Sequence, residues 1–224
     1  MPLKVVLTGA SGMIGKGVLL ECLDNKAVEK VLSVSRKPIG IEHPKLEELI
    51  HTDFTDFEPA QEQIRAFEPG ACFHCMGVSS NGMKEAEYSR LTYDVTKSLA
   101  DTIYAVNYKG VFIYVSGAGT DGTEQGRLMW ARVKGKTENY ILNRGFGAAY
   151  AFRIGMVIPG KGIRSKSGWV NALLTITRPF YGLFKLSKSV STSSQVGRAM
   201  IIAARTQIAG SIIDAREIRA LGES

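Results

Sequence analysis

Three glycines with a fixed spacing follow a short apolar run near the start of the chain. Gly9, Gly12 and Gly15 lie in the segment TGASGMIG, residues 8–15, between apolar residues 5–7 and a stretch with helical periodicity. This spacing allows a tight turn, lets the backbone approach a pyrophosphate and lets the helix pack closely on the strand. The helix start then offers N–H groups and the positive end of its dipole to phosphate. The segment predicts a dinucleotide site made of Gly9, Ser11, Gly12, Met13, Ile14 and Gly15.

The residues after the second apolar run can distinguish the two nicotinamide dinucleotides. A carboxylate about 20 residues beyond the glycines accepts the ribose 2′-hydroxyl of NAD, whereas an arginine there pairs with the 2′-phosphate of NADP. Arg36 and Lys37 stand at that place, since 36 − 15 = 21 residues separate Arg36 from Gly15. We therefore expect NADP(H) as the preferred cofactor, with NAD(H) as the alternative. Asp53, followed by Phe54, is expected near adenine, while the competing interpretation makes Asp53 a turn-capping residue.

Alternating strands and helices must position these residues. We expect strands over residues 5–7, 31–34, 49–51, 71–76, 111–115, 149–154 and 211–213, and helices over residues 13–23, 61–67, 85–106, 129–143 and 195–204. Such alternation is typical of a parallel sheet with helices on both faces. The 224 residues therefore predict one doubly wound α/β domain, a Rossmann fold, in which residues 160–194 form a small C-terminal lid or substrate region.

Six segments together resemble the short-chain dehydrogenase/reductase superfamily, in its extended and atypical branches of NAD(P)-dependent epimerases and dehydratases. They are TGASGMIG at 8–15, SRKP at 35–38, VSGAGTDG at 115–122, WARVKGKTE at 130–138, RIGMVIPG at 153–160 and DAREIRALG at 214–222. Over most of its length the chain is similar to the Tat-interacting-protein-like oxidoreductases. The resemblance implies that Cys75, Met76 and Gly77 line the cofactor, that Asp53 contacts adenine, and that Lys134 bonds the nicotinamide ribose.

The resemblance also implies an active site with a serine and a Tyr–Lys pair four residues apart on one helix face. Ser116 and Lys134 match the serine and the lysine, but Trp130 stands at the tyrosine position. An indole N–H only donates a hydrogen bond, so Trp130 can orient a carbonyl but cannot protonate it. Two hypotheses follow. One is an NADP-dependent oxidoreductase or epimerase-like enzyme with another acid; the other is a non-catalytic NADP(H)-binding redox sensor or interaction protein.

Other aromatic and basic residues are candidates for the substrate side of the site. Tyr88 and Tyr93 could replace the missing phenol, although each is more readily explained as structural, and Tyr114 is expected in the core. Residues 161–188 are basic and aromatic, which favours a substrate lid over a membrane-surface helix or a nucleic-acid patch. We place on the substrate side Tyr88, Arg153, Arg164 and Trp169.

Composition sets the remaining expectations. Lys and Arg number 28 against 21 Asp and Glu, a net charge of +7 that suits anionic ligands without choosing among them. Three cysteines and no visible targeting segment fit a cytoplasmic protein. The segment Cys72–Cys75 reads as part of an apolar strand, so we expect no metal site. We expect a small-molecule substrate, no nucleic-acid partner, and a monomer or homodimer.

Overall fold

A computed structural model describes residues 2–160 and 190–224 of the chain. Its main sheet has seven parallel strands in the order β3-β2-β1-β4-β5-β6-β9. The strands are β1 (Leu3–Thr8), β2 (Val28–Ser35), β3 (Leu46–Ile50), β4 (Ala71–His74), β5 (Val111–Gly117), β6 (Ala148–Ile154) and β9 (Ile212–Ile213). The order reverses beside β1, because β2 and β3 lie on one side of it and β4 on the other. The doubly wound α/β fold predicted from the sequence is confirmed.

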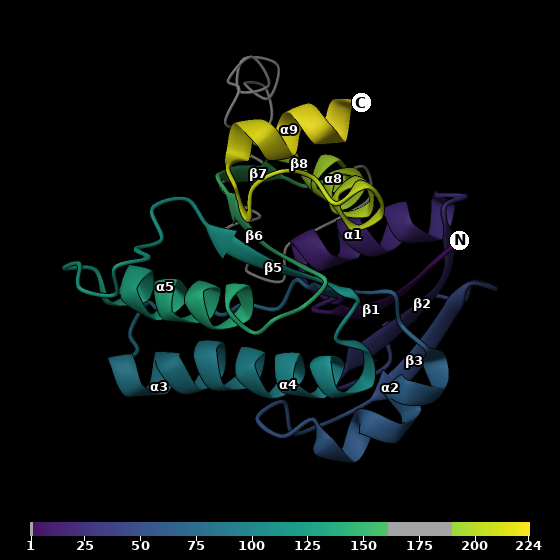
Figure 1. The fold of residues 1–224 in the computed structure, drawn as a ribbon, viewed down its shortest axis with the longest axis horizontal. Helices are drawn as coiled ribbons and strands as arrows, with labels where there is room; N and C mark the ends of the chain where they lie inside the picture. The colour runs from purple at the N-terminus through teal and green to yellow at the C-terminus, as the bar shows by residue number, and fades with distance from the viewer. Residues whose placement is uncertain (1, 161–189) are drawn as a thin grey trace.

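Helices cover both faces of this sheet (Figure 1). One face carries α1 (Met13–Asp24), α8 (Ser193–Thr206) and α9 (Ala215–Glu223). The other carries α2 (Gln61–Phe67), α4 (Val95–Asn107) and α5 (Met129–Leu142), and α3 (Glu85–Ser89) precedes α4. A π-helical turn, Arg90–Asp94, joins α3 to α4, so the long predicted helix over 85–106 exists but changes its winding in the middle.

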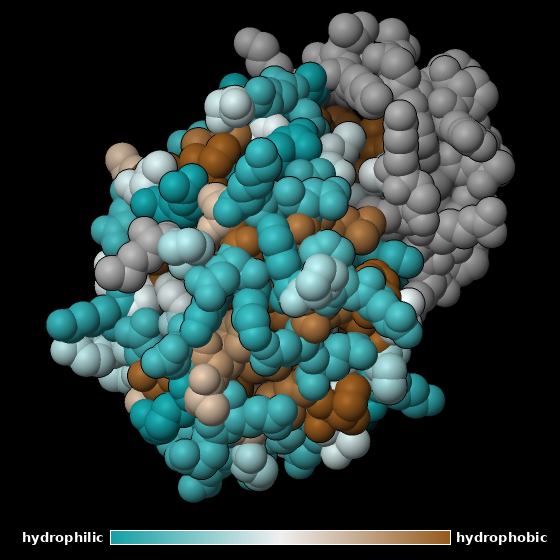
Figure 2. Space-filling model, turned by 90° about the vertical axis from the view of Figure 1, so that its right-hand side faces the viewer, coloured by the Kyte–Doolittle hydropathy of each residue, from teal (hydrophilic) through white to brown (hydrophobic). Residues whose placement is uncertain are grey.

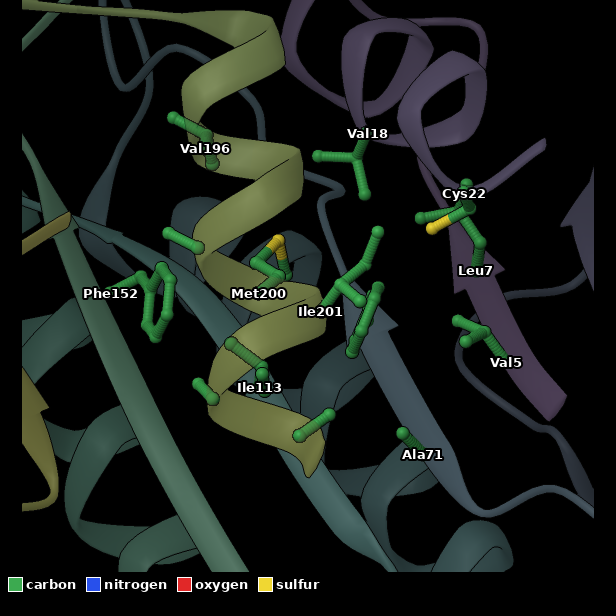
Figure 3. Packing of buried hydrophobic residues seen from close by; sticks show 14 of the residues in the cluster. Val5, Leu7, Val18, Cys22, Ala71, Ile113, Phe152, Val196, Met200 and Ile201 are labelled. Carbon is green, nitrogen blue, oxygen red and sulfur yellow. The ribbon is translucent and has the colours of Figure 1, made fainter. Parts of the chain in front are cut away.

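Each face of the sheet has its own apolar layer. Val196, Met200 and Ile201 of α8 belong to one layer with Val18 of α1 and Ile113 of β5, and Ile201 lies on the side of α8 that faces Val18 (Figure 3). The opposite layer joins β4 and β5 to α2, α4 and α5. Burial of these side chains contributes roughly 25 cal/mol per Å² of apolar surface, so the two layers hold the sheet and helices in place.

Very close packing fixes α8 against α1. A Cβ atom on Gly17 of α1 would lie 2.4 Å from Cβ of Ser193, and one on Gly197 of α8 would lie 3.1 Å from Cα of Val18. Only hydrogen fits at both positions without a shift of the backbone. The Oγ atom of Ser193 also accepts a hydrogen bond from Gly160 N at 2.9 Å.

Within the described residues, two short strands and one helix with more than two turns were not expected from the sequence. β7 (Met156–Ile158) and β8 (Val190–Thr192) pair in parallel as a separate two-stranded sheet, and α9 follows β9. Most of the predicted lid, residues 161–189, lies outside the described residues. In the part of the chain that the structure describes, no helix is long and apolar enough to cross a membrane.

One face of the molecule is mainly polar. Figure 2 shows one face of the molecule, on which hydrophilic residues predominate and hydrophobic ones appear in several separate areas. Among the described residues, the large apolar side chains that remain exposed come from different parts of the fold: Ile50, Val78, Tyr108, Leu128, Met156 and Ile212. Single exposed apolar residues of this kind are normal in globular proteins.

Candidate functional site

The turn between β1 and α1 needs glycine for steric reasons. Gly9 has a φ of +78°, and a Cβ atom on it would lie 2.6 Å from the carbonyl carbon of Cys75. A Cβ atom on Gly15 would lie 2.1 Å from the carbonyl oxygen of Gly9, and one on Gly12 3.3 Å from the same atom. The turn is closed by a hydrogen bond from Gly12 N to Gly9 O at 2.8 Å. The three glycines therefore allow strand, turn and helix to pack this tightly.

The start of α1 is open to a ligand. Gly12 is its N-cap residue and provides no side-chain hydrogen bond to the first turn. Backbone N–H groups at a helix start lack acceptors within the helix, and they carry the positive end of its dipole. An anionic group can therefore be held here by main-chain atoms alone.

A cleft of about 540 Å³ lies in front of this helix start. It lies beyond the carboxyl ends of the strands, at the point between β1 and β4 where the strand order reverses. Ligands of open α/β sheets usually bind at such a point. Nine residues predicted from the sequence meet in its lining: Gly12, Met13, Ile14, Cys75, Met76, Gly77, Ser116, Trp130 and Lys134. Its other lining residues are Val115, Gly117, Ala118, Ile154 and Gly155.

The predicted cofactor residues outside this lining lie nearby in the turn or after β2 and β3. Ser11 is exposed in the glycine turn. Arg36 and Lys37 are exposed directly after β2, and within residues 2–160 and 190–224 neither forms an ion pair. They are therefore available cations on the side of β1 away from β4.

Asp53 follows β3 and stabilises its own turn. Its Oδ1 atom accepts hydrogen bonds from N and Oγ1 of Thr55 at 2.9 and 2.6 Å. These bonds lower the pKa of the carboxyl group. The turn-capping interpretation of Asp53 thus has a structural basis. The Phe54 ring packs against Phe57, with ring centroids 5.1 Å apart.

The hydroxyl proton of Ser116 is directed away from a ligand. Thr120 donates its single hydroxyl proton to the carbonyl oxygen of Gly117 at 2.8 Å. The hydrogen bond of 3.0 Å between the Ser116 and Thr120 hydroxyls must therefore be donated by Ser116. In this arrangement Ser116 offers only lone pairs to the cleft.

The indole ring of Trp130 lies against the loop that follows β5. A Cβ atom on Gly119 would lie 3.4 Å from the Cη2 atom of Trp130, and one on Gly117 would lie 3.8 Å from its Cζ3 atom. The ring thus forms part of the cleft wall beside the end of β5. Its Nε1–H group can donate a hydrogen bond but does not release its proton near neutral pH.

Lys134 lies between the cleft and two buried phenols. Its Nζ atom donates a hydrogen bond to the Tyr114 hydroxyl at 3.1 Å and lies 5.1 Å from the centre of that ring. Burial lowers the pKa of the lysine, and the nearby Tyr88 opposes this shift. Tyr88 is 2% exposed and Tyr114 1%, and neither lines the cleft. Burial raises the pKa of both phenols.

Tyr93, the other candidate for the missing phenol, lies in the π-helical turn away from the cleft lining. Its ring packs edge-on against Tyr140, with centroids 5.7 Å apart, and the Nζ atom of Lys136 lies 4.2 Å from its centre. The structure therefore favours the structural interpretation of this residue.

A buried histidine beneath the cleft was not identified from the sequence as part of the site. Thr96 donates its proton to Thr92 O at 2.6 Å, so the Nε2–H of His74 donates to Thr96 Oγ1 at 3.0 Å. Nδ1 of His74 then accepts from Thr8 Oγ1 at 2.6 Å. Burial, with a smaller contribution from Lys134, lowers the pKa of His74 to about 3. The neutral imidazole therefore ties the end of β1, just before Gly9, to β4 and α4.

Arg153, predicted on the substrate side, is engaged in a structural ion pair. Its Nε and Nη2 atoms donate to Oε1 and Oε2 of Glu138 at 3.1 and 2.6 Å, and Glu138 is 1% exposed. The carboxylate raises the pKa of the guanidinium. Arg153 is not among the cleft residues. Arg164 and Trp169, the other predicted substrate residues, lie outside the described residues.

Comparison with known proteins agrees with this geometry. Residues 5–141 match the model of the NAD dependent epimerase/dehydratase family. The chain is 23% identical over 202 residues to protein fmp52-2, mitochondrial, of Aspergillus terreus, covering 90% of this chain and 83% of that protein. It is 25% identical over 180 residues to protein HTATIP2 of Rattus norvegicus, covering 80% and 70%.

Solved structures share the fold. The enzyme WbmH of Bordetella bronchiseptica, in complex with NAD+, superposes with a TM-score of 0.70 at 18% identity, over 96% of this chain and 75% of that one. ADP-L-glycero-D-manno-heptose-6-epimerase of Helicobacter pylori gives a TM-score of 0.71 at 17% identity, over 99% and 82%. The chain thus belongs to the NAD dependent epimerase/dehydratase family, as an atypical short-chain dehydrogenase/reductase related to the Tat-interacting-protein-like proteins.

Proposed function

We propose that the protein binds NADP(H) in this cleft, in preference to NAD(H), and transfers hydride to or from a small carbonyl or hydroxyl compound. The observation that carries the proposal is the glycine turn, where added Cβ atoms on Gly9 and Gly15 would collide with backbone. Such a turn, with an uncapped helix start beside it, suits a pyrophosphate that approaches the main chain closely. The bound NAD+ of the similar enzyme WbmH supports the same type of cofactor.

The residues around the cleft suggest how the cofactor would be held. The start of α1 would bind the phosphates, and Lys134 would bond the nicotinamide ribose. A bound nicotinamide ring supplies hydride chemistry that protein side chains lack. The mostly apolar walls, with Met13, Ile14 and Met76, would exclude water from the ring.

Two exposed cations support the preference for NADP(H). Arg36 and Lys37 follow β2, and no carboxylate stands at the place where it would bond a ribose 2′-hydroxyl. A guanidinium can bind a 2′-phosphate through two parallel hydrogen bonds. Both side chains are exposed, so a phosphate can reach them.

A titration by fluorescence tests the cofactor and its preference. NADPH should bind more tightly than NADH, and Arg36→Ala should weaken NADPH binding by about 10- to 100-fold, because a hydrogen bond to a charged group contributes roughly 1.5–3 kcal/mol. NADH binding should change little. Lys26→Ala is the matched control, since Lys26 is an exposed cation before β2, at the opposite edge of the sheet. Equal losses for both coenzymes in Arg36→Ala would contradict the preference.

A non-catalytic NADP(H)-binding sensor is the second candidate. Trp130 favours it, because the residue at this position cannot exchange a proton.

A cytoplasmic location and a monomeric or dimeric state remain predictions, and the relative from Aspergillus terreus is described as mitochondrial.

A further inference from the structure

We propose that Lys134 itself gives the proton to the oxygen of the reacting carbonyl, in the role that a phenol would otherwise fill. This inference rests on the proposed function, because it concerns the reduction of a carbonyl in the same cleft. The protein would then be an active enzyme although it carries Trp130 in place of a tyrosine.

The first argument is the set of groups that reach the cleft. Among the described residues that line the cleft, only Cys75 and Lys134 carry side chains that can ionise. Cys75 packs against the apolar layer under α1, and burial raises the pKa of its thiol well above the usual value. A thiol in such surroundings is a poor proton donor. Lys134 is therefore the one ionisable group of the described cleft lining that is suited to proton transfer.

The second argument is that Ser116 and Trp130, the other hydrogen-bond donors considered for the site, cannot supply the proton. The Ser116 proton is committed to Thr120, because the Thr120 proton is itself committed to Gly117 O. Trp130 can donate a hydrogen bond but cannot release its proton near neutral pH. The ammonium group of Lys134 is left as the donor that can both bind a carbonyl oxygen and give up a proton.

The third argument is the surroundings of the ammonium group. Over the described ranges Lys134 forms no ion pair. Glu138, four residues further along the same helix, opposes the fall in the pKa of Lys134, but its carboxylate is held in an ion pair by Arg153. The remaining groups that face Lys134 are the neutral phenols of Tyr114 and Tyr88 and the neutral imidazole of His74.

This arrangement eases loss of the proton. Burial without a paired carboxylate disfavours a charged amine and lowers its pKa. The two phenols do not compete as acids, because burial raises the pKa of each. Tyr114 can instead orient the amine by accepting one of its N–H groups.

The step balances as a carbonyl reduction. The carbonyl carbon gains a hydride with its electron pair from the dihydronicotinamide, which is oxidised. The carbon–oxygen π bond opens toward oxygen, an Nζ–H bond of Lys134 breaks, and its proton joins the oxygen to give the alcohol. The electron pair of that bond stays on Nζ, and the neutral amine recovers a proton from water.

A titration without cofactor provides the first test. The ¹³Cε shift of each lysine, assigned through the backbone, is followed against pH by nuclear magnetic resonance. Lys136 is the internal reference, because it is exposed on the same helix. Lys134 should lose its proton at a lower pH than this reference, because burial lowers the pKa of its amine. Equal midpoints for the two lysines would overturn the proposal, even in a protein that binds the coenzyme.

The second test measures turnover with NADPH and 4-nitrobenzaldehyde as the probe. Lys134→Arg keeps a positive charge and its hydrogen-bond donors, but a guanidinium does not deprotonate in proteins. At saturating NADPH it should lower the rate about 100-fold or more, the usual contribution of a general acid. The control Lys136→Arg should keep the wild-type rate.

The outcomes separate this inference from the proposed function. Failure of wild-type protein to bind either coenzyme would refute the proposed function. Binding of NADPH without reduction of the probe, or an unchanged rate in Lys134→Arg, would overturn the role of Lys134 and leave cofactor binding intact. If Lys134→Arg does not fold, the titration of the wild-type lysines decides alone.

Discussion

Acid should destabilise the folded protein through one buried group, His74. Its pKa in the folded state is about 3, whereas the ordinary value is 6.5. Since the folded pKa is the lower one, the unfolded chain binds a proton between these values and the folded chain does not. The contribution of neutral His74 to stability is therefore complete above about pH 6.5, and it is lost as the pH falls toward 3.

The size of the effect follows from the difference in proton binding. One pKa unit corresponds to about 1.4 kcal/mol, so the free energy of unfolding should fall by about 1 kcal/mol at about pH 5.5 and about 3 kcal/mol at about pH 4.5. Urea unfolding at about pH 7.5, 5.5 and 4.5 measures this loss in the wild type and in His74→Gln. His74→Gln should not show this loss of stability between about pH 7.5 and 4.5. Its free energy of unfolding at about pH 7.5 should be lower than that of the wild type by about 1–3 kcal/mol, because Thr8 and Thr96 lose their hydrogen-bond partner.

His43→Gln is the control for loss of a histidine, since His43 lies in the loop between β2 and β3. It should follow the wild-type dependence on pH. A direct measurement adds to this: the ¹³Cε1 shift of His74 should stay constant from about pH 8 to 5. Parallel stability curves for wild type and His74→Gln, or a His74 resonance that titrates near its ordinary pKa, would refute the reasoning.

Three further predictions concern the cleft and its supports. Gly15→Ala should abolish NADPH binding in a fluorescence titration, because its Cβ would lie 2.1 Å from a backbone oxygen, while Gly122→Ala, whose Cβ would have no neighbour closer than 3.8 Å and which lies outside the cleft lining, should bind normally. Arg153→Met should cost about 3–5 kcal/mol in urea unfolding, because Glu138 stays buried without its partner; a cost below 1 kcal/mol would contradict this. Trp130→Tyr should raise the rate of aldehyde reduction, since it adds a phenol beside the cleft lysine; an unchanged rate would argue against a shortage of proton donors.

The sequence predicted the elements whose patterns are local. The helix expected over residues 61–67 is α2, Gln61–Phe67, and the buried strands around the glycine turn lie within a few residues of their predicted places. The three-residue strands β7 and β8 were missed because so short a segment has no measurable period. The helix α9 could have been found, since Asp214 and Glu217 form a capping box at its start.

The sequence predicted which residues form the candidate site but not the hydrogen bonds among them. Ser116, Trp130 and Lys134 were placed by a motif, and the cleft does bring them together. The direction of the Ser116 proton depends on how the loop folds Thr120 back onto Gly117 O, which no residue spacing reveals. Tyr114 was expected in the core and is buried there, but its bond to Lys134 depends on how α5 lies over β5.

The close packing of α1 against α8 links the cleft to a part of the fold outside its lining. Gly17 and Gly197 let the two helices approach each other closely, while the N-terminal end of α1 faces the cleft. A methyl group added at position 197 would have to displace α8, α1 or both. A substitution at position 197 should therefore change ligand affinity by moving the start of α1, although Gly197 is not among the residues that line the cleft.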